Sequence, residues 1–228
     1  MPRSIQLWHN AELLRRGVDR AAEQGYSFTL GGITEYGIRR LEHEIGGLAL
    51  EYGDHVTKPL HAGTKREITQ ALDRAYHAID DPAIPAATLF GNKLARDIIR
   101  QRRLAYPELE KWAATEAGYQ LYRTSDHHIA KHRDRESDQL LAATITIAGV
   151  AIVSIHEPIG DPNDYTNTIE IDRVETGPGT VMFLRAPGFR SGQQVVHEVH
   201  PPTVLPRAIL NLRMRPDILP SPTELAAG

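Results

Sequence analysis

The segment TVMFLRAPGFRSGQQVVHEVHPPTVLPRAILNLRMR, residues 180–215, decides the fold. Apolar and polar side chains alternate in three stretches of this segment, and turn-forming Pro and Gly residues separate them. The predicted strands are Thr180–Arg185, Val195–His200 and Arg207–Arg215. Short strands joined by polar turns are typical of antiparallel sheets, so the C-terminal part of the chain is predicted to be all β.

The same alternation begins near Gly118 and predicts five earlier strands. They are Tyr119–Arg123, His128–His132, Leu140–Ala148, Ala151–His156 and Thr168–Val174. Gly149 stands between the third and the fourth and is predicted to form a turn. Eight short strands with turns at this spacing favour a sandwich or a jelly roll.

Residues 1 to about 115 are predicted to be mostly helical, because their apolar residues recur at helical spacing. The predicted helices are Asn10–Gln24, Thr34–Glu44, Thr64–Ile79 and Asn92–Leu104, and Tyr26–Leu30 is predicted to be a short strand. We therefore expect one α+β domain. In it a helical region, residues 1–116, packs around a jelly-roll core, residues 117–216, and residues 217–228 form a tail.

Composition excludes several classes of function. The 228 residues include no Cys, which removes disulfides, thiolate metal sites, Fe–S clusters and cysteine nucleophiles. The net charge is −3, without the basic excess of a dedicated nucleic-acid binder. The longest uncharged run, Leu140–Ile155, has 16 residues, whereas a membrane helix needs about 20. We expect a soluble, cytoplasmic protein that does not interact with membranes.

Three features of the strand region point to a metal site. His132 and Asp134 are two positions apart at the end of a predicted strand, so both side chains leave the same face of the extended chain. His197 lies in a separate strand, and Arg207 opens the last strand. Two His and one carboxylate leave half of a metal's coordination sphere open, as a non-haem Fe(II) oxygenase requires. A buried Arg suits the far carboxylate of a dicarboxylate co-substrate.

Strand alternation tests this assignment. In the last strand, one face carries the polar and charged residues together with one isoleucine, and the other face is entirely apolar. The first face consists of Arg207, Ile209, Asn211 and Arg213, and the second of Ala208, Leu210, Leu212 and Met214. Two arginines and an asparagine on one face suit a barrel interior that holds a ligand. In the preceding strand His197 and His200 point in opposite directions, and we expect His197 to be the ligand.

This set of residues resembles the Fe(II)/2-oxoglutarate-dependent dioxygenases, in which His-x-Asp, a distal His and a basic residue on the last strand lie in a double-stranded β-helix. The stretch from His197 to Arg207 is similar to the prolyl-hydroxylase-type enzymes. The stretch from Gln120 and Tyr122 to Asp134 is similar to the AlkB-like branch, although Gln120 replaces an Asn and the spacing is one residue longer. The resemblance covers residues 117–216.

The resemblance implies that His132, Asp134 and His197 hold Fe(II). It implies that 2-oxoglutarate, the co-substrate, binds the metal and pairs with Arg207, and that Gln120, Tyr122, Asn211 and Arg213 lie around it. Arg213 is expected either to contact the near carboxylate of 2-oxoglutarate or to orient Asp134. The implied reaction consumes O2, releases succinate and CO2, and oxidises a small organic substrate, with hydroxylation favoured over halogenation by Asp134.

Several alternatives stay open on the sequence. Lys131, Arg133 and Arg135 around the metal fit an AlkB-like oxidative dealkylation of nucleic acid, and a protein hydroxylase is a third reading. A cupin-like protein that binds metal without turnover is a fourth. Tyr122 is equally well explained as a core residue. Asp138 is interpreted as a solvated loop acid.

Overall fold

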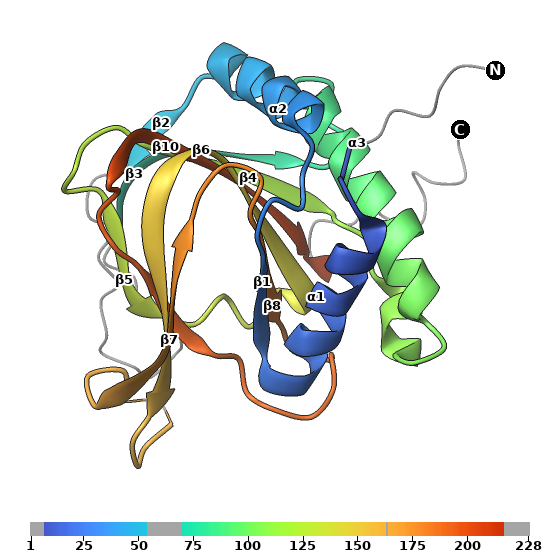
Figure 1. Ribbon diagram of the computed structural model, residues 1–228, viewed down its shortest axis with the longest axis vertical. Helices are drawn as coiled ribbons and strands as arrows, with labels where there is room; N and C mark the ends of the chain where they lie inside the picture. Colours follow the sequence, from blue (N-terminus) through green and yellow to red (C-terminus); the bar gives the residue numbers. More distant parts are fainter. Residues whose placement is uncertain (1–6, 54–69, 163, 217–228) are drawn as a thin grey trace.

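The computed structural model describes residues 7–53, 70–162 and 164–216. Within them the chain forms three α-helices and ten strands (Figure 1). The helices are α1 (Ala11–Gln24), α2 (Glu35–Gly47) and α3 (Pro85–Leu94). The strands are β1 (Tyr26–Thr29), β2 (Glu51–Gly53), β3 (Gln70–Ala78), β4 (Glu116–Tyr122), β5 (His128–His132), β6 (Gln139–Pro158), β7 (Thr168–Thr176), β8 (Val181–Arg185), β9 (Val196–Val199) and β10 (Val204–Met214).

The strands close into an antiparallel barrel. Strands β6, β10, β4, β3, β5 and β9 pair in this order, and β9 pairs again with β6, so that no edge is left between them. Strands β1 and β8 extend the larger sheet beyond β6, β2 pairs with β3, and β7 extends the smaller sheet. This closed barrel confirms the predicted α+β fold with a jelly-roll core.

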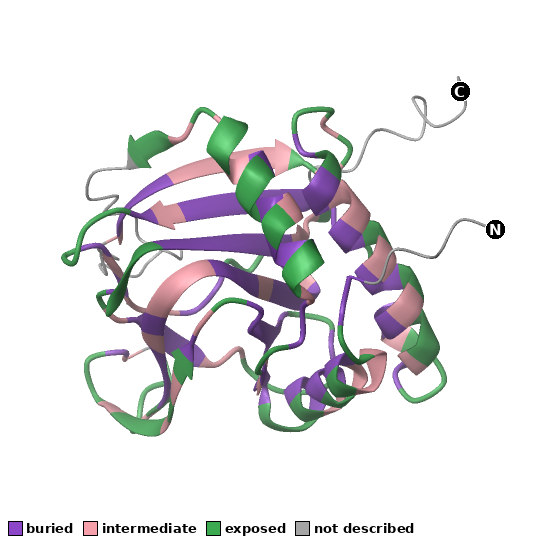
Figure 2. Ribbon diagram, turned by 45° about the horizontal axis from the view of Figure 1, so that its top comes forward, coloured by how far each residue is buried: buried purple, intermediate pink, exposed green. Residues whose placement is uncertain are grey.

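The helices pack on the outer face of the larger sheet (Figure 1). Asn10 and Thr34 cap α1 and α2 through their side-chain oxygens, which accept hydrogen bonds from the backbone N–H groups of Glu12 and Gly37. Each helix buries the side that faces the sheet and exposes the other (Figure 2). One apolar cluster thus fills the space between helices and sheet, and a second lies inside the barrel. No helix in the described ranges is long and apolar enough to cross a membrane.

The prediction of a helix over Thr64–Ile79 is wrong for residues 70–78, which form β3, while residues 64–69 lie outside the described ranges. The local spacing of apolar residues suggests a helix, but pairing with β4 makes this segment a wall of the barrel. Its Leu72 belongs to the barrel core, and Arg74 and Tyr76 line the interior.

The predicted helix at Asn92–Leu104 begins earlier than expected. Pro85 occupies the first turn of α3, and the buried Glu44 of α2 accepts hydrogen bonds from the backbone N–H groups of Ala86 and Ala87 at this helix start. The helical path then continues as a wider turn, η1 (Ala95–Ile99), and a tighter one, η2 (Arg100–Arg102). The Glu44 carboxylate of α2 therefore caps the start of α3. No local sequence pattern reveals this contact, because the two residues belong to different helices.

Two predicted strands are one. Leu140–Ala148 and Ala151–His156 are parts of the 20-residue strand β6. Gly149 has φ +69°, a conformation that favours glycine, and it lets β6 bend instead of ending it. The first half of β6 pairs with β8 and β10 in the larger sheet, and the second half pairs with β9 and β7 in the smaller one. This bend brings the two sheets together around the barrel interior.

Candidate functional site

Strands β5 and β9 bring the predicted metal ligands together. His132 is the last residue of β5 and stands directly opposite His197 of β9 in the register, and their ring centroids are 4.2 Å apart. Asp134 follows on the loop after β5, with Oδ1 4.0 Å from Nε2 of His132. One ligand atom from each of the three residues lies within 4.8 Å of the other two. This donor set suits a divalent transition metal with open coordination positions.

The ring of His132 is held in a defined orientation. Its Nδ1 lies 2.8 Å from the carbonyl oxygen of Ala130, which accepts a hydrogen bond only if Nδ1 carries the proton. This leaves Nε2, the atom nearest Asp134, with its lone pair free. A fixed tautomer of this kind is typical of histidines that bind metals.

The electrostatics of the three residues favour the forms that bind a metal. Burial lowers the pKa of His132 to about 3, and the adjacent His197 acts in the same direction. Burial also lowers the pKa of His197. Burial by itself raises the pKa of Asp134, but Arg213 and the two imidazoles more than reverse this effect, so the net shift is downward. At neutral pH the two imidazoles are therefore neutral and Asp134 is ionised. Protons do not compete with a metal for these three side chains.

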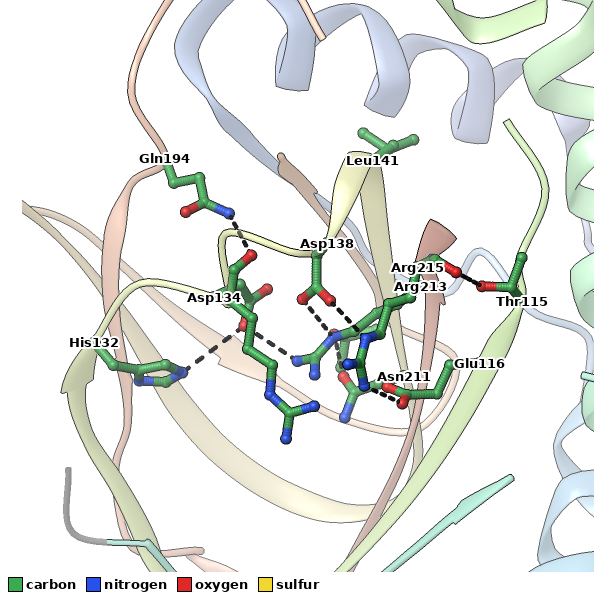
Figure 3. A network of polar contacts seen from close by, with 12 residues as sticks. Thr115, Glu116, His132, Asp134, Asp138, Leu141, Gln194, Asn211, Arg213 and Arg215 are labelled. Atoms are coloured by element: carbon green, nitrogen blue, oxygen red, sulfur yellow. Dashed lines mark hydrogen bonds and ion pairs between the residues drawn. The ribbon is translucent and has the colours of Figure 1, made fainter. Parts of the chain in front are cut away.

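Arg213 connects the last strand to this cluster (Figure 3). Its Nη2 donates a hydrogen bond of 3.1 Å to Oδ1 of Asp134, and its Nε lies 3.5 Å from Oδ2 of Asp138. Of the two roles expected for Arg213, the structure shows the contact with Asp134. Arg215 adds an ion pair of 2.7 Å with Glu116 beside it.

The interpretation of Asp138 as a solvated loop acid is wrong. Its side chain is 1% exposed, and burial raises its pKa to about 6 although Arg213 acts against this shift. Asp138 directly precedes β6 and faces Arg213 of β10, two strands that are hydrogen-bonded neighbours. No sequence pattern identifies this contact, because residues 138 and 213 are joined only through the sheet.

Arg207 is a buried cation without an acidic partner in the described ranges. It is 1% exposed, and its Nε and Nη1 have no hydrogen-bond partner among the described residues. Its guanidinium carbon lies 4.9 Å from the ring centroid of Tyr122, the residue opposite it on β4, and Nη2 is 3.4 Å from Oγ1 of Thr176. An unpaired buried charge is costly, so these donors suit an anionic ligand.

A cavity of about 420 Å³ in the barrel contains these groups. Seven of the eight site residues predicted from the sequence line it, namely Gln120, His132, Asp134, His197, Arg207, Asn211 and Arg213. All four residues of the polar β10 face line it, as alternation predicts. Tyr122 does not, since its ring lies against Arg207 instead, and this favours the interpretation of Tyr122 as a core residue.

A second cluster of His and Glu lies outside this cavity and was missed by the sequence analysis. Nε2 of His156 is 2.9 Å from Oε1 of Glu198, and Glu170 completes a group of three residues with close ligand atoms. His200 bonds to Ser154 Oγ over 2.8 Å and is absent from the cavity lining. Within this group His156 already has Glu198 as its partner.

Known proteins resemble this chain in their structures and not in their sequences. The sequence matches no protein-family profile, and no curated protein matches it either. A prolyl-4-hydroxylase from Pseudomonas putida superposes with a TM-score of 0.61 at 15% identity, covering 89% of this chain and 98% of its own. A prolyl hydroxylase from Trichoplax adhaerens, solved with a hypoxia inducible factor oxygen degradation domain peptide fragment, gives 0.60 at 12% identity, covering 91% of this chain and 92% of its own.

A third solved structure is SnoK, a non-haem alpha-ketoglutarate-dependent carbocyclase from nogalamycin biosynthesis. It gives a TM-score of 0.57 at 14% identity, covering 88% of this chain and 83% of its own. At identities this low, the superpositions establish a common fold and nothing finer. The chain therefore has the fold of structures described as prolyl hydroxylases and as an alpha-ketoglutarate (2-oxoglutarate)-dependent enzyme, which confirms the predicted resemblance at that level.

Proposed function

We propose that this chain is an Fe(II)- and 2-oxoglutarate-dependent oxygenase that hydroxylates or otherwise oxidises a small organic substrate and releases succinate and CO2. One observation carries the proposal. The cluster of His132, Asp134 and His197 opens into the same cavity as Arg207, a buried guanidinium with two unpartnered nitrogens among the described residues.

The residues present fit both groups. Two neutral imidazoles and one carboxylate would hold Fe(II) and leave positions for 2-oxoglutarate and O2. Arg207 would pair with the far carboxylate of 2-oxoglutarate through its planar pair of donors. Gln120 and Asn211 also line the cavity. The side chain of Asn211 accepts a hydrogen bond of 2.6 Å from Thr144. Bound Fe(II) and 2-oxoglutarate would supply the oxidising chemistry.

The protein's own part is orientation and exclusion of water. Arg213 holds Asp134 in place, and the carbonyl of Ala130 fixes the ring of His132. Tyr122 supports Arg207 with its ring, whose centroid lies 4.9 Å from the guanidinium carbon. We propose that residues 117–216 carry all of these groups as the catalytic core and that residues 1–116 support it, with β3 as one wall of the barrel. Two structural neighbours are prolyl hydroxylases, so a prolyl-containing peptide is the second candidate substrate.

Anaerobic thermal melts test the proposal. Wild type and Asp134→Ala are each melted alone, with Fe(II), with 2-oxoglutarate and with both. A ligand at about 100 times its Kd adds about 2.7 kcal/mol, or several degrees for a domain of this size. We expect a shift with both ligands in the wild type and in the control Asp80→Ala, which changes an exposed acid outside the cavity. The shift should be lost in Asp134→Ala.

Two other outcomes would contradict the proposal. A shift with metal alone, unchanged by 2-oxoglutarate, would support a cupin-like metal-binding protein. No shift under any condition would mean that the three ligands and Arg207 are not a metal and co-substrate site.

A further inference from the structure

The cavity contains more cations than the proposed metal and co-substrate require. Five arginines and only two carboxylates, Glu51 and Asp134, are among the described residues that line it. Arg213 is paired with Asp134 and Asp138, and Arg207 is assigned to the far carboxylate of 2-oxoglutarate. The other three are Arg74, Arg133 and Arg135.

Arg133 is the most informative of the three because it is buried. It is 8% exposed, and its guanidinium lies 5.4 Å from the ring centroid of Tyr165 and donates one hydrogen bond of 3.1 Å to Oε1 of Gln193. Its Nε has no hydrogen-bond partner, and no carboxylate pairs with it, within the described part of the chain. A guanidinium that is stacked and almost out of water, with a donor unused, is suited to bind an anion.

Arg74 and Arg135 add positive charge to the lining, and neither forms an ion pair within 4 Å in the described ranges. Arg74 is half-buried and donates to the neutral Gln70, and Arg135 is exposed and lies 5.8 Å from the ring of Tyr76. Fe(II) and the 2-oxoglutarate dianion would cancel each other, so an excess of positive charge would remain.

We propose that the substrate is a small organic anion with an apolar body, whose carboxylate or phosphate group is bound by Arg133. This inference rests on the proposed function and names the substrate class for it. Arg74 and Arg135 attract the anion electrostatically. The apolar part of the lining receives the carbon skeleton, and it consists of Ile129, Val153, Met182, Leu184, Val199 and Ile209.

The arrangement favours a small anion over a nucleic acid. A phosphodiester backbone is bound by cations spread over an exposed surface, whereas Arg133 is a buried residue of the cavity lining. Lys131, which flanks the metal site in the sequence, donates to Thr168 of β7 over 3.1 Å and does not line the cavity. The basic residues near His132 therefore do not form one continuous surface.

The test measures binding and does not depend on turnover. Protein loaded with Mn(II) and N-oxalylglycine, an unreactive analogue of 2-oxoglutarate, is titrated calorimetrically with phenylacetate, phenyl phosphate and the neutral phenylacetamide. At least one anion should bind about tenfold or more tightly than phenylacetamide, since a hydrogen bond to a charged group contributes more than one between neutral groups. Arg133→Gln should remove this preference, and Arg133→Lys should restore part of it.

Controls separate this inference from the proposed function. Arg100→Gln, an exposed arginine outside the cavity, should bind the anions as the wild type does. Arg133→Gln should still bind Mn(II) and N-oxalylglycine, which shows that it is folded and that the metal site is intact. If the loaded wild type binds the amide as well as both anions, or binds none of the three, the inference is wrong and the proposed function stands.

Binding of an oligothymidylate that falls steeply with salt, without binding of the small anions, would also overturn the inference and would favour a nucleic-acid substrate. Failure of the wild type to bind Mn(II) and N-oxalylglycine at all would instead contradict the proposed function.

Discussion

Arg213 of β10 donates a hydrogen bond of 3.1 Å to Asp134 and so connects the last strand of the barrel to the loop that carries a proposed metal ligand. The two residues are 79 positions apart in the chain. Asp138 lies beside the same guanidinium, with its Oδ2 3.5 Å from Nε (Figure 3). The position of Asp134 therefore depends on a contact made through the fold and not on its own loop alone.

Arg213→Gln should weaken metal binding about 10- to 100-fold, as loss of a residue that orients a ligand typically does. The Kd for Mn(II), measured by calorimetry, checks this. Arg215→Gln is the matched control, because Arg215 belongs to the same network through its ion pairs with Glu116 and Asp138. Equal losses in both variants would mean that Arg213 acts only on the stability of the fold. Arg213→Lys should recover part of the affinity.

Asp138 should make the stability of the metal-free protein depend on pH. Because burial raises its pKa to about 6 in the folded state, against 3.8 for the ordinary group, the folded state binds the proton more tightly. The stabilisation that Asp138 contributes to the folded state is therefore fully present below about pH 4 and is lost as the pH rises through 6. Over this pH range the free energy of unfolding of the wild type should fall by up to about 3 kcal/mol relative to that of Asp138→Asn, as measured by urea unfolding. A constant difference between the two proteins would contradict the assignment.

Arg207→Ala should weaken 2-oxoglutarate binding by about 2 kcal/mol or more, because the far carboxylate loses its charged donors, and should leave the Kd for Mn(II) within a few-fold. Tyr122→Leu should have a smaller effect in the same direction, since it removes only the aromatic face beside the guanidinium. Calorimetric titration of the Mn(II)-loaded proteins checks both. Equal loss of metal and co-substrate in Arg207→Ala would remove Arg207 from its proposed role.

His197→Ala should abolish retention of Fe(II), whereas His200→Ala should largely retain it. The two side chains leave opposite faces of the chain, His197 toward the cavity and His200 toward Ser154. Metal content after anaerobic gel filtration distinguishes them. The reverse result would mean that the register of β9 against β5 is wrong.

Gly149→Ala should destabilise the protein by more than about 2 kcal/mol. A Cβ at this position would lie 2.5 Å from the carbonyl oxygens of Val204 and Pro206 and 2.6 Å from Cα of Arg207, in a backbone with φ +69°. The variant should also weaken 2-oxoglutarate binding, because relief of the clash displaces Arg207. Gly177→Ala, where the nearest atom is 3.7 Å away, is the control for thermal unfolding. Similar melting temperatures in the two variants would contradict this role for the bend.

The sequence predicts the barrel strands and the cavity face of β10 well, because a period of two is a local property that burial on one side of a strand imposes directly. It predicts α1 and α2 for a similar reason, since the helical spacing of their apolar residues is also a local pattern. It fails at β3 and at the start of α3, where the deciding partners are β4 and Glu44, and both are distant in the chain.

The sequence itself thus determined the His-x-Asp pair, the distal His and the inward Arg. Their residue types and spacings, together with the alternation of side chains along a strand, are enough to identify them. Only the tertiary structure decided that Arg213 holds Asp134, that Asp138 is buried, that Tyr122 supports Arg207 and that Arg133 is enclosed with a donor unused. The physical reason is that burial and pairing depend on which strands become neighbours. The bend of β6 at Gly149 and the closure of the barrel determine which strands are neighbours. No short stretch of sequence reveals this pairing.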